Sequence, residues 1–127
     1  MTITAAVIAE IEAHAREKAP EECCGLLLGG SDRITASVRA GNTADDRRRR
    51  YNIDPRDHFS AIRHGRTLGL EVIGAYHSHP ASAPIPSETD RAEAFESFVF
   101  LIVSGHDLRA WRLRSGNFTE VPLVRLP

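Results

Sequence analysis

The sequence predicts an α/β fold in which one mixed β-sheet is flanked by helices. Short apolar runs bounded by glycine or polar residues recur along the chain, as buried strands do. Between them lie stretches whose apolar residues have helical spacing, so helices and strands are interleaved. The 127 residues suffice for one compact core, and they contain no internal repeat, low-complexity tract or shift in composition. We therefore expect residues 1–127 to form a single domain.

The first predicted element is a helix over residues 4–19. Its apolar side chains recur at helical spacing, and Pro20 ends it. Residues 24–30 form a short apolar run closed by glycines, which indicates a buried strand. Residues 33–40 alternate well enough between apolar and polar side chains for a second strand. The short turn between these two strands predicts a hairpin.

The second half of the chain begins with a polar loop over residues 41–54. Asp54 is a candidate N-cap, and Pro55 stands at the first position of a helix that we expect to reach about Thr67. A central strand is then predicted at residues 71–76, a helix at 87–95 and an apolar strand at 98–103. A closing hairpin is predicted from strands at residues 108–114 and 117–124.

Charge and composition exclude several classes of function. The formal net charge is -1 and the sequence pI is near 6.6, so the chain lacks the basic balance of a nucleic-acid-binding domain. No stretch approaches the ~20 apolar residues that a membrane span needs, and the N-terminus does not resemble a signal peptide. Cys23 and Cys24 are adjacent and could not easily bridge within a strand, which indicates reduced thiols. We expect a cytoplasmic protein.

A candidate metal site lies where the predicted strand 71–76 ends. His77 and His79 are two positions apart, which places both imidazoles on the same face of a strand. Asp90 could supply a third ligand from the first turn of the next helix. Two histidines and one carboxylate leave the fourth position of tetrahedral zinc open, as in catalytic sites. The same ligand set also suits non-haem iron.

Each half of this pattern also has a structural explanation. A His-x-His pair at the end of a strand is more often a surface feature than a metal site. Ser87 and Asp90 have the spacing of a capping box, in which a serine and an acidic residue satisfy the first turn of a helix. If Asp90 acts only as a cap, two ligands remain and zinc binds poorly.

The complete segment resembles a known family. From His77 to Asp90 the chain agrees with the JAMM signature of the MPN-plus (Mov34/MPN/PAD-1) zinc metallopeptidases, His-x-His-Pro-x6-Ser-x2-Asp, at every defined position. Upstream, the segment from Pro20 to Gly29 is similar to the family's glutamate-bearing stretch, with Glu22 at the catalytic position. The resemblance covers about residues 3–124 and implies a JAMM/MPN, cytidine-deaminase-like sandwich.

The resemblance also implies a role for each residue. His77, His79 and Asp90 would bind Zn²⁺, which lowers the pKa of a bound water toward ~7. Glu22 would accept the proton of that water and pass it to the leaving amine. Ser87 would donate a hydrogen bond to the oxyanion of the tetrahedral intermediate. Because the glutamate and all three ligands are present, the resemblance favours a zinc metallopeptidase over the scaffold branch of the same fold.

Within the family, the chain most resembles small prokaryotic members that act on ubiquitin-like sulfur carrier proteins. This resemblance rests on the small size, the Pro-x-Glu-x-Cys-Gly pattern that begins at Pro20, and residues 51–55. It implies cleavage after the carrier's C-terminal Gly-Gly, with release of cysteine or a short extension. The alternatives are the same chemistry on another substrate (a deubiquitinase-like or phage or cell-wall peptidase) and a non-catalytic carrier-binding module. The arginine run 47–50 is either a dock for an acidic carrier surface or a solvated loop.

Overall fold

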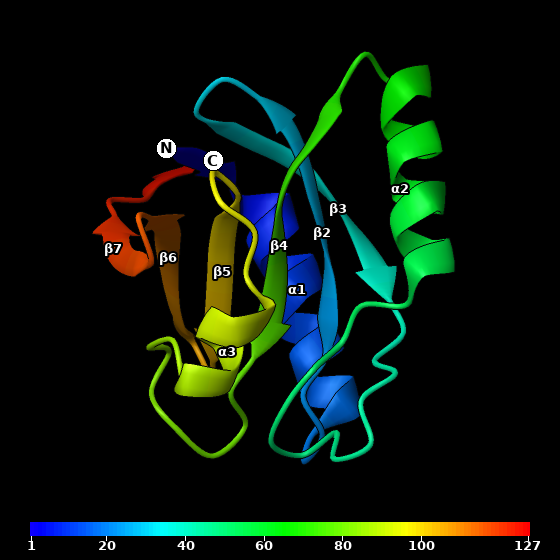
Figure 1. Cartoon of the computed structure of the whole chain (residues 1–127). Coiled ribbons are helices and arrows are strands. Elements are labelled where there is room, and N and C mark those ends of the chain that lie inside the picture. The colour runs from blue at the N-terminus through cyan, green and yellow to red at the C-terminus, as the bar shows by residue number, and fades with distance from the viewer.

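The computed structural model of the chain consists of one eight-stranded sheet with helices packed on both faces (Figure 1). It describes the backbone of residues 1–127 and the side chains of residues 1–91 and 94–127. The strands are β1 (Thr2–Thr4), β2 (Cys24–Gly30), β3 (Arg33–Ala40), β4 (Glu71–Ser78), β5 (Val99–Ser104), β6 (Asp107–Arg114), β7 (Asn117–Val121) and β8 (Val124–Leu126). The helices are α1 (Ala5–Lys18), α2 (Pro55–Thr67) and α3 (Glu88–Glu93). This architecture confirms the predicted fold class.

The strands follow one another across the sheet in the order β7-β6-β5-β4-β2-β3-β1-β8. The central strand β4 pairs antiparallel with β2 and parallel with β5. At one side of the sheet, β1 pairs parallel with both β3 and β8. The sheet is therefore mixed, and the C-terminal end of β4 lies between the start of β2 and the end of β5.

Two separate cores form because successive side chains of a strand point to opposite faces of the sheet. Tyr76 and Leu101 are buried on the face that packs against α1. Their neighbours along the same strands, Ala75 and Phe100, are buried with residues of α2 on the other face. His77 follows the same alternation as Ala75, so its side chain lies on the α2 face.

Both long helices lie where the sequence predicts them. Thr4 caps α1 and accepts a hydrogen bond from the amide of Val7, and the helix ends just ahead of Pro20. Asp54 caps α2, which begins at Pro55 as expected. These helices thus begin and end at residues whose chemistry favours a helix boundary.

Some elements differ from the expectation. The ladder between β2 and β4 pairs Cys24 with His77, so β4 continues to Ser78 instead of ending at residue 76. The helix α3 ends before residue 95, and the chain continues as strand over 124–126 in β8. The sequence does not predict β1 or β8, because each has three residues and forms by pairing with a neighbouring strand.

Among the residues that the structure describes, no helix is long and apolar enough to cross a membrane.

Candidate metal centre

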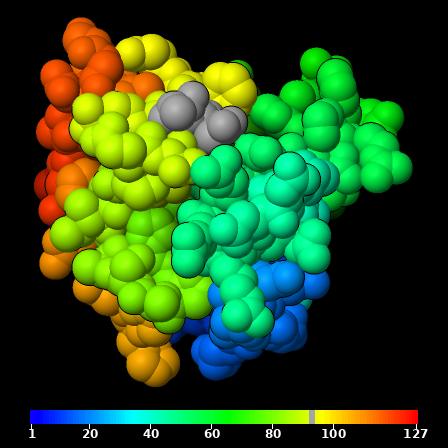
Figure 2. All heavy atoms as spheres, turned by 60° about the horizontal axis from the view of Figure 1, so that its bottom comes forward, coloured from blue at the N-terminus to red at the C-terminus, as the bar shows by residue number. Residues whose placement is uncertain are grey.

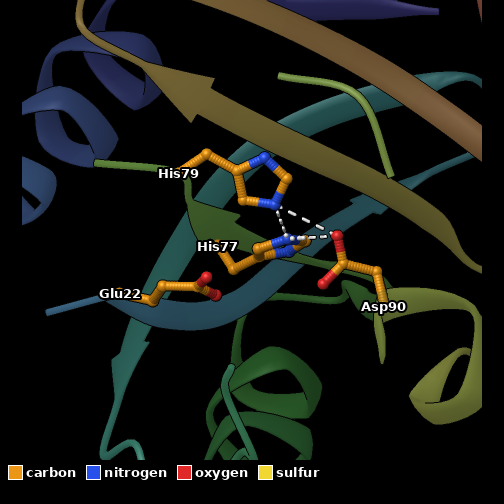
Figure 3. Close-up of side chains that lie close together, drawn as sticks. All are labelled: Glu22, His77, His79 and Asp90. Atoms are coloured by element: carbon orange, nitrogen blue, oxygen red, sulfur yellow. Dashed lines mark hydrogen bonds and ion pairs between the residues drawn. The ribbon is translucent and has the colours of Figure 1, made fainter. Parts of the chain in front are cut away.

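Four buried polar side chains meet where β4 ends (Figure 3). His77 belongs to β4 and His79 follows it, whereas Asp90 comes from α3 and Glu22 precedes β2. The antiparallel register sets Cys24 opposite His77, which brings Glu22 beside the two histidines. The fold therefore gathers all three predicted metal ligands and the predicted general base in one place.

Hydrogen bonds between strand ends fix this meeting point. The hydroxyl of Ser78 accepts a hydrogen bond from the amide of Cys23 at 2.8 Å, and the Ser78 amide donates to the Cys23 carbonyl at 3.1 Å. On the other side, the His79 amide donates to the carbonyl of Val103 in β5 at 2.9 Å. The residue between the two histidines thus joins β4 to β2, a role that the sequence pattern alone does not reveal.

The ligand atoms of the four side chains all lie within 4.8 Å of one another. Asp90 Oδ2 is 3.2 Å from His77 Nε2 and 3.1 Å from His79 Nε2. The two Nε2 atoms are 3.1 Å apart. Glu22 extends toward these atoms from the side opposite Asp90 (Figure 3). Donor atoms that converge this closely fit a cation, since zinc bonds to nitrogen and oxygen are roughly 2.0–2.2 Å long.

The two imidazoles are held in orientation by different contacts. His79 Nδ1 lies 2.8 Å from the carbonyl oxygen of Ala83. Because a carbonyl can only accept, Nδ1 carries the proton and the lone pair of a neutral His79 is on Nε2. His77 Nδ1 is buried without a hydrogen-bond partner among the described residues. The His77 ring instead stacks on Tyr51, with centroids 4.2 Å apart and planes 19° from parallel.

The two carboxyl groups of the cluster have opposite electrostatic environments. Burial raises the pKa of Glu22 to about 7, with the charge of His79 opposing the shift and the charge of Asp90 adding to it. Burial alone would raise the pKa of Asp90 as well, but contact with the imidazoles of His77 and His79 holds that pKa well below its usual range. Asp90 is therefore a permanent anion, whereas Glu22 can take up and release a proton near neutral pH.

Ser87 and Asp90 form the capping box that their spacing predicts, and Asp90 also faces the histidines. The Ser87 hydroxyl accepts a hydrogen bond from the Asp90 amide at 3.0 Å, and Asp90 Oδ2 accepts one from the Ser87 amide at 2.9 Å. The same Oδ2 atom contacts both imidazoles. Cap and site geometry are therefore compatible, because the first turn of α3 directs this oxygen toward the cluster.

The two thiols near the site are protonated and unreactive at neutral pH. Cys23 and Cys24 are both buried and unbridged. Burial raises the pKa of Cys24 to about 12 and also raises the pKa of Cys23. Because the thiolate is the reactive form, neither side chain suits a nucleophile at neutral pH.

Two surface segments border the site. Figure 2 shows the end of the molecule that carries it, where the loop of residues 41–54 lies beside the segment of residues 80–91. An apolar cleft of about 370 Å³ adjoins the site through Tyr51, and Phe95 and Phe98 also line it. Sequence reasoning missed Tyr51 as a neighbour of His77, since the contact depends on how the 41–54 loop folds back onto β4.

The chain is similar to known proteins over most of its length. The family described as prokaryotic homologs of the JAB domain matches residues 4–114. A desampylase of Haloferax volcanii is 42% identical over 74% of this chain and 73% of that protein. A CysO-cysteine peptidase of Mycobacterium tuberculosis is 32% identical over 97% of this chain and 89% of that protein. A solved structure from Desulfitobacterium hafniense has a TM-score of 0.88 and 28% identity, covering 98% of this chain and 92% of that one.

Proposed function

This chain belongs to the family of prokaryotic homologs of the JAB domain, and we propose that it cleaves ubiquitin-like sulfur carrier proteins with the help of Zn²⁺. As a JAMM-type hydrolase, it would cut the peptide or isopeptide bond after the carrier's C-terminal Gly-Gly and release cysteine or a short extension. One observation carries the proposal. His77, His79 and Asp90 converge on one buried point, and the carboxylate of Glu22 reaches the same point.

The donor set suits Zn²⁺. Two imidazole nitrogens and one carboxylate oxygen are ligands of catalytic zinc, which keeps a fourth position for water or substrate. Burial lowers the pKa of His77, which favours the neutral ring that a metal requires. Oε1 of Glu22 is buried without a hydrogen-bond partner among the described residues, as expected for a group that works with a bound water. When bound, Zn²⁺ supplies a Lewis acid that acidifies water and polarises the scissile carbonyl.

Glu22 would move the proton during hydrolysis. Its carboxylate takes a proton from the attacking water as the water oxygen adds to the carbonyl carbon. The same carboxyl group then gives that proton to the leaving nitrogen as the C–N bond breaks, so the products are a carrier carboxylate and an amine. A general base of this kind contributes ~10²–10⁴-fold to the rate, and its proton-transfer role favours hydrolysis over the oxygen chemistry of iron.

Ser87 would stabilise the oxyanion that forms on the scissile carbonyl. Its hydroxyl oxygen accepts the hydrogen bond that caps α3, which leaves the hydroxyl hydrogen to donate to a substrate. The side chain is exposed, so a bound substrate can reach it. The Ser87 hydroxyl would thus cap α3 through its oxygen and donate to the substrate through its hydrogen.

The relatives support a carrier protein as the substrate. Their names identify a desampylase and a CysO-cysteine peptidase. An extended carrier tail would enter between the 41–54 loop and the 80–91 segment, where terminal glycines need little room. An apolar side chain of the tail would occupy the cleft of about 370 Å³ beside Tyr51. The exposed side chains of Arg48 and Arg50 would face an acidic carrier surface.

Mass spectrometry tests this function. A sulfur carrier that ends in Gly-Gly-Cys is incubated with zinc-loaded wild type, with Glu22→Gln, and with the matched neighbour variant Glu21→Gln. We expect the wild type and Glu21→Gln to trim the carrier to Gly-Gly and Glu22→Gln to leave it intact. Equal trimming by Glu22→Gln would refute the role of the base. Carrier binding without any trimming would favour a non-catalytic binding module.

A further inference from the structure

The side chain of Asn42 uses its full hydrogen-bonding capacity just beyond the end of β3. Its Nδ2 donates to the carbonyl of Glu22 at 3.0 Å and to the carbonyl of Arg50 at 3.1 Å. Its Oδ1 accepts from the amide of Ala44 at 3.0 Å and from the amide of Asn52 at 3.1 Å. A side-chain amide offers two N–H donors and one oxygen with two lone pairs, so every position is satisfied. Asn42 therefore joins the 41–54 loop to the segment that precedes β2.

This junction holds Glu22 from both sides of its backbone. The Glu22 carbonyl accepts the hydrogen bond from Asn42, and the Glu22 amide donates to the carbonyl of Arg47 at 2.7 Å. Glu22 precedes β2, whose ladder of pairs begins at Cys24, so these two bonds replace strand pairing at this position. Oε1 of Glu22 has no hydrogen-bond partner among the described residues, so no hydrogen bond holds this oxygen in place, whereas two hydrogen bonds hold the Glu22 backbone.

We propose that Asn42 is a positioning residue, which keeps the Glu22 carboxylate aimed at the metal centre by fixing the Glu22 backbone. The inference rests on the proposed function, in which Glu22 transfers the proton. Proton transfer requires heavy atoms about 2.6–3.2 Å apart. A misplacement of roughly 1 Å can cost on the order of 10²-fold in rate. Asn42 acts through the backbone, because the four hydrogen bonds of its side chain all go to backbone groups.

Asn42→Asp is the most informative variant because it nearly preserves the shape of the side chain. The carboxylate still accepts from the amides of Ala44 and Asn52, but it has no hydrogen to donate to the carbonyl of Glu22. Asn42→Ala removes all four bonds. Asn117→Asp is the matched control, since it makes the same charge change at an exposed position of the edge strand β7.

The test compares the wild-type chain with Asn42→Asp, Asn42→Ala and Asn117→Asp, all loaded with zinc, on the Gly-Gly-Cys carrier. We expect kcat to fall about 10- to 100-fold in both Asn42 variants. In Asn42→Asp, which keeps the bonds to Ala44 and Asn52 within the loop, KM and the Zn²⁺ dissociation constant should change by less than about threefold. Hydrogen exchange at the Glu22 amide should accelerate by about tenfold, while the Tyr76 amide in β4 keeps its wild-type rate. Asn117→Asp should match the wild type in every measurement.

An unchanged kcat in Asn42→Asp would overturn the inference. Equal losses of kcat and zinc affinity would also overturn it, since they would place the effect in the metal centre or in the fold as a whole. A wild type that cleaves no carrier would refute the proposed function instead. In that case the exchange comparison decides about Asn42, because an unchanged rate at the Glu22 amide would show that Asn42 does not hold this segment.

Discussion

At the scale of single residues, one carboxylate oxygen of Asp90 serves both the cap of α3 and the proposed metal centre. Oδ2 accepts a hydrogen bond from the Ser87 amide and lies 3.2 and 3.1 Å from the imidazole nitrogens of His77 and His79. These partners favour the charged carboxylate and keep the pKa of Asp90 well below its usual range despite burial. The hydrogen bonds that begin α3 therefore also fix the position of the proposed ligand Asp90.

Substitution of Ser87 tests its proposed role as oxyanion donor and its role as the cap of α3 by two different measurements. In Ser87→Ala we expect kcat to fall about 10²–10³-fold, because the oxyanion loses its donor. The free energy of unfolding should fall by about 1 kcal/mol, because the cap of α3 is lost. Ser87→Thr keeps a hydroxyl, so its kcat and its free energy of unfolding should both lie near the wild-type values. Steady-state kinetics and urea unfolding measure the two effects, and wild-type kcat in Ser87→Ala would rule out the donor role.

The Tyr51 ring takes the place of the hydrogen bond that usually orients a metal-ligating histidine. We expect Tyr51→Leu to weaken Zn²⁺ binding by about 10-fold, in the range found for such supporting contacts. Tyr51→Phe keeps the ring that stacks on His77 and should bind Zn²⁺ like the wild type. Competition with a chromophoric chelator measures the Zn²⁺ dissociation constants of the two variants. Equal affinity of the Leu and Phe variants would contradict the orienting role.

At the scale of elements, a buried polar contact joins α1 to β4 on the face of the sheet opposite His77. His14 Nδ1 lies 2.8 Å from the hydroxyl oxygen of Tyr76, and the two rings meet edge to face. The Tyr76 ring fills the space beside Gly25, where an added Cβ would lie 2.3 Å from it. Burial, with the nearby charges of Arg39 and Lys18, lowers the pKa of His14 to about 4.

The lowered pKa of His14 predicts a loss of stability in mild acid. The unfolded chain takes up a proton near the ordinary histidine pKa of about 6.5, whereas the folded chain does so only near pH 4. The contribution is therefore fully present above pH ~6.5 and is lost as the pH falls to ~4, by on the order of 3 kcal/mol. Urea unfolding across this window should show a shallower pH dependence for His14→Gln than for the wild type. The exposed-site control His64→Gln should keep the wild-type slope, and an unchanged slope in His14→Gln would contradict the assignment.

The elements that the sequence predicted share a clear local pattern. The helix over residues 5–18 has apolar residues at helical spacing, and the strand over residues 24–30 is a continuous apolar run. By contrast, β1 and β8 carry no pattern of their own, because three-residue strands exist only through their partners. The contact of Tyr51 with His77 escaped prediction for a similar reason, since it depends on the path of a loop through space.

At the scale of the whole molecule, the two apolar cores are built without the side chains of the candidate metal centre. One core forms between α1 and the sheet and another between α2 and the opposite face, and apolar side chains fill both. The spacing from His77 to Asp90 and the segment around Glu22 led the sequence analysis to the four side chains that meet in the structure, and their roles stay a prediction. The sequence could not anticipate the contacts of Asn42, because four hydrogen bonds from one amide are a property of the folded loop.

Removal of zinc should therefore leave a folded protein of lower stability. At a free Zn²⁺ concentration of 100 times the dissociation constant, binding should add about 2.7 kcal/mol to the free energy of unfolding. The metal-free protein should still unfold in one cooperative transition, with the near-UV circular dichroism of a packed core. Urea titrations with and without a chelator measure the difference. A metal-free chain that is already unfolded would mean that the centre is structural and that the two apolar cores are not sufficient for folding.

In the proposed arrangement, His77, His79 and Asp90 bind the metal and Glu22 lies beside it without binding it. Anomalous diffraction from zinc-loaded crystals, recorded on both sides of the zinc absorption edge, tests this central claim most directly. We expect one zinc peak at roughly 2.0–2.2 Å from His77 Nε2, His79 Nε2 and an oxygen of Asp90, with Glu22 outside the ligand shell. A peak bound by Glu22 in place of Asp90, or zinc located elsewhere on the chain, would contradict this claim.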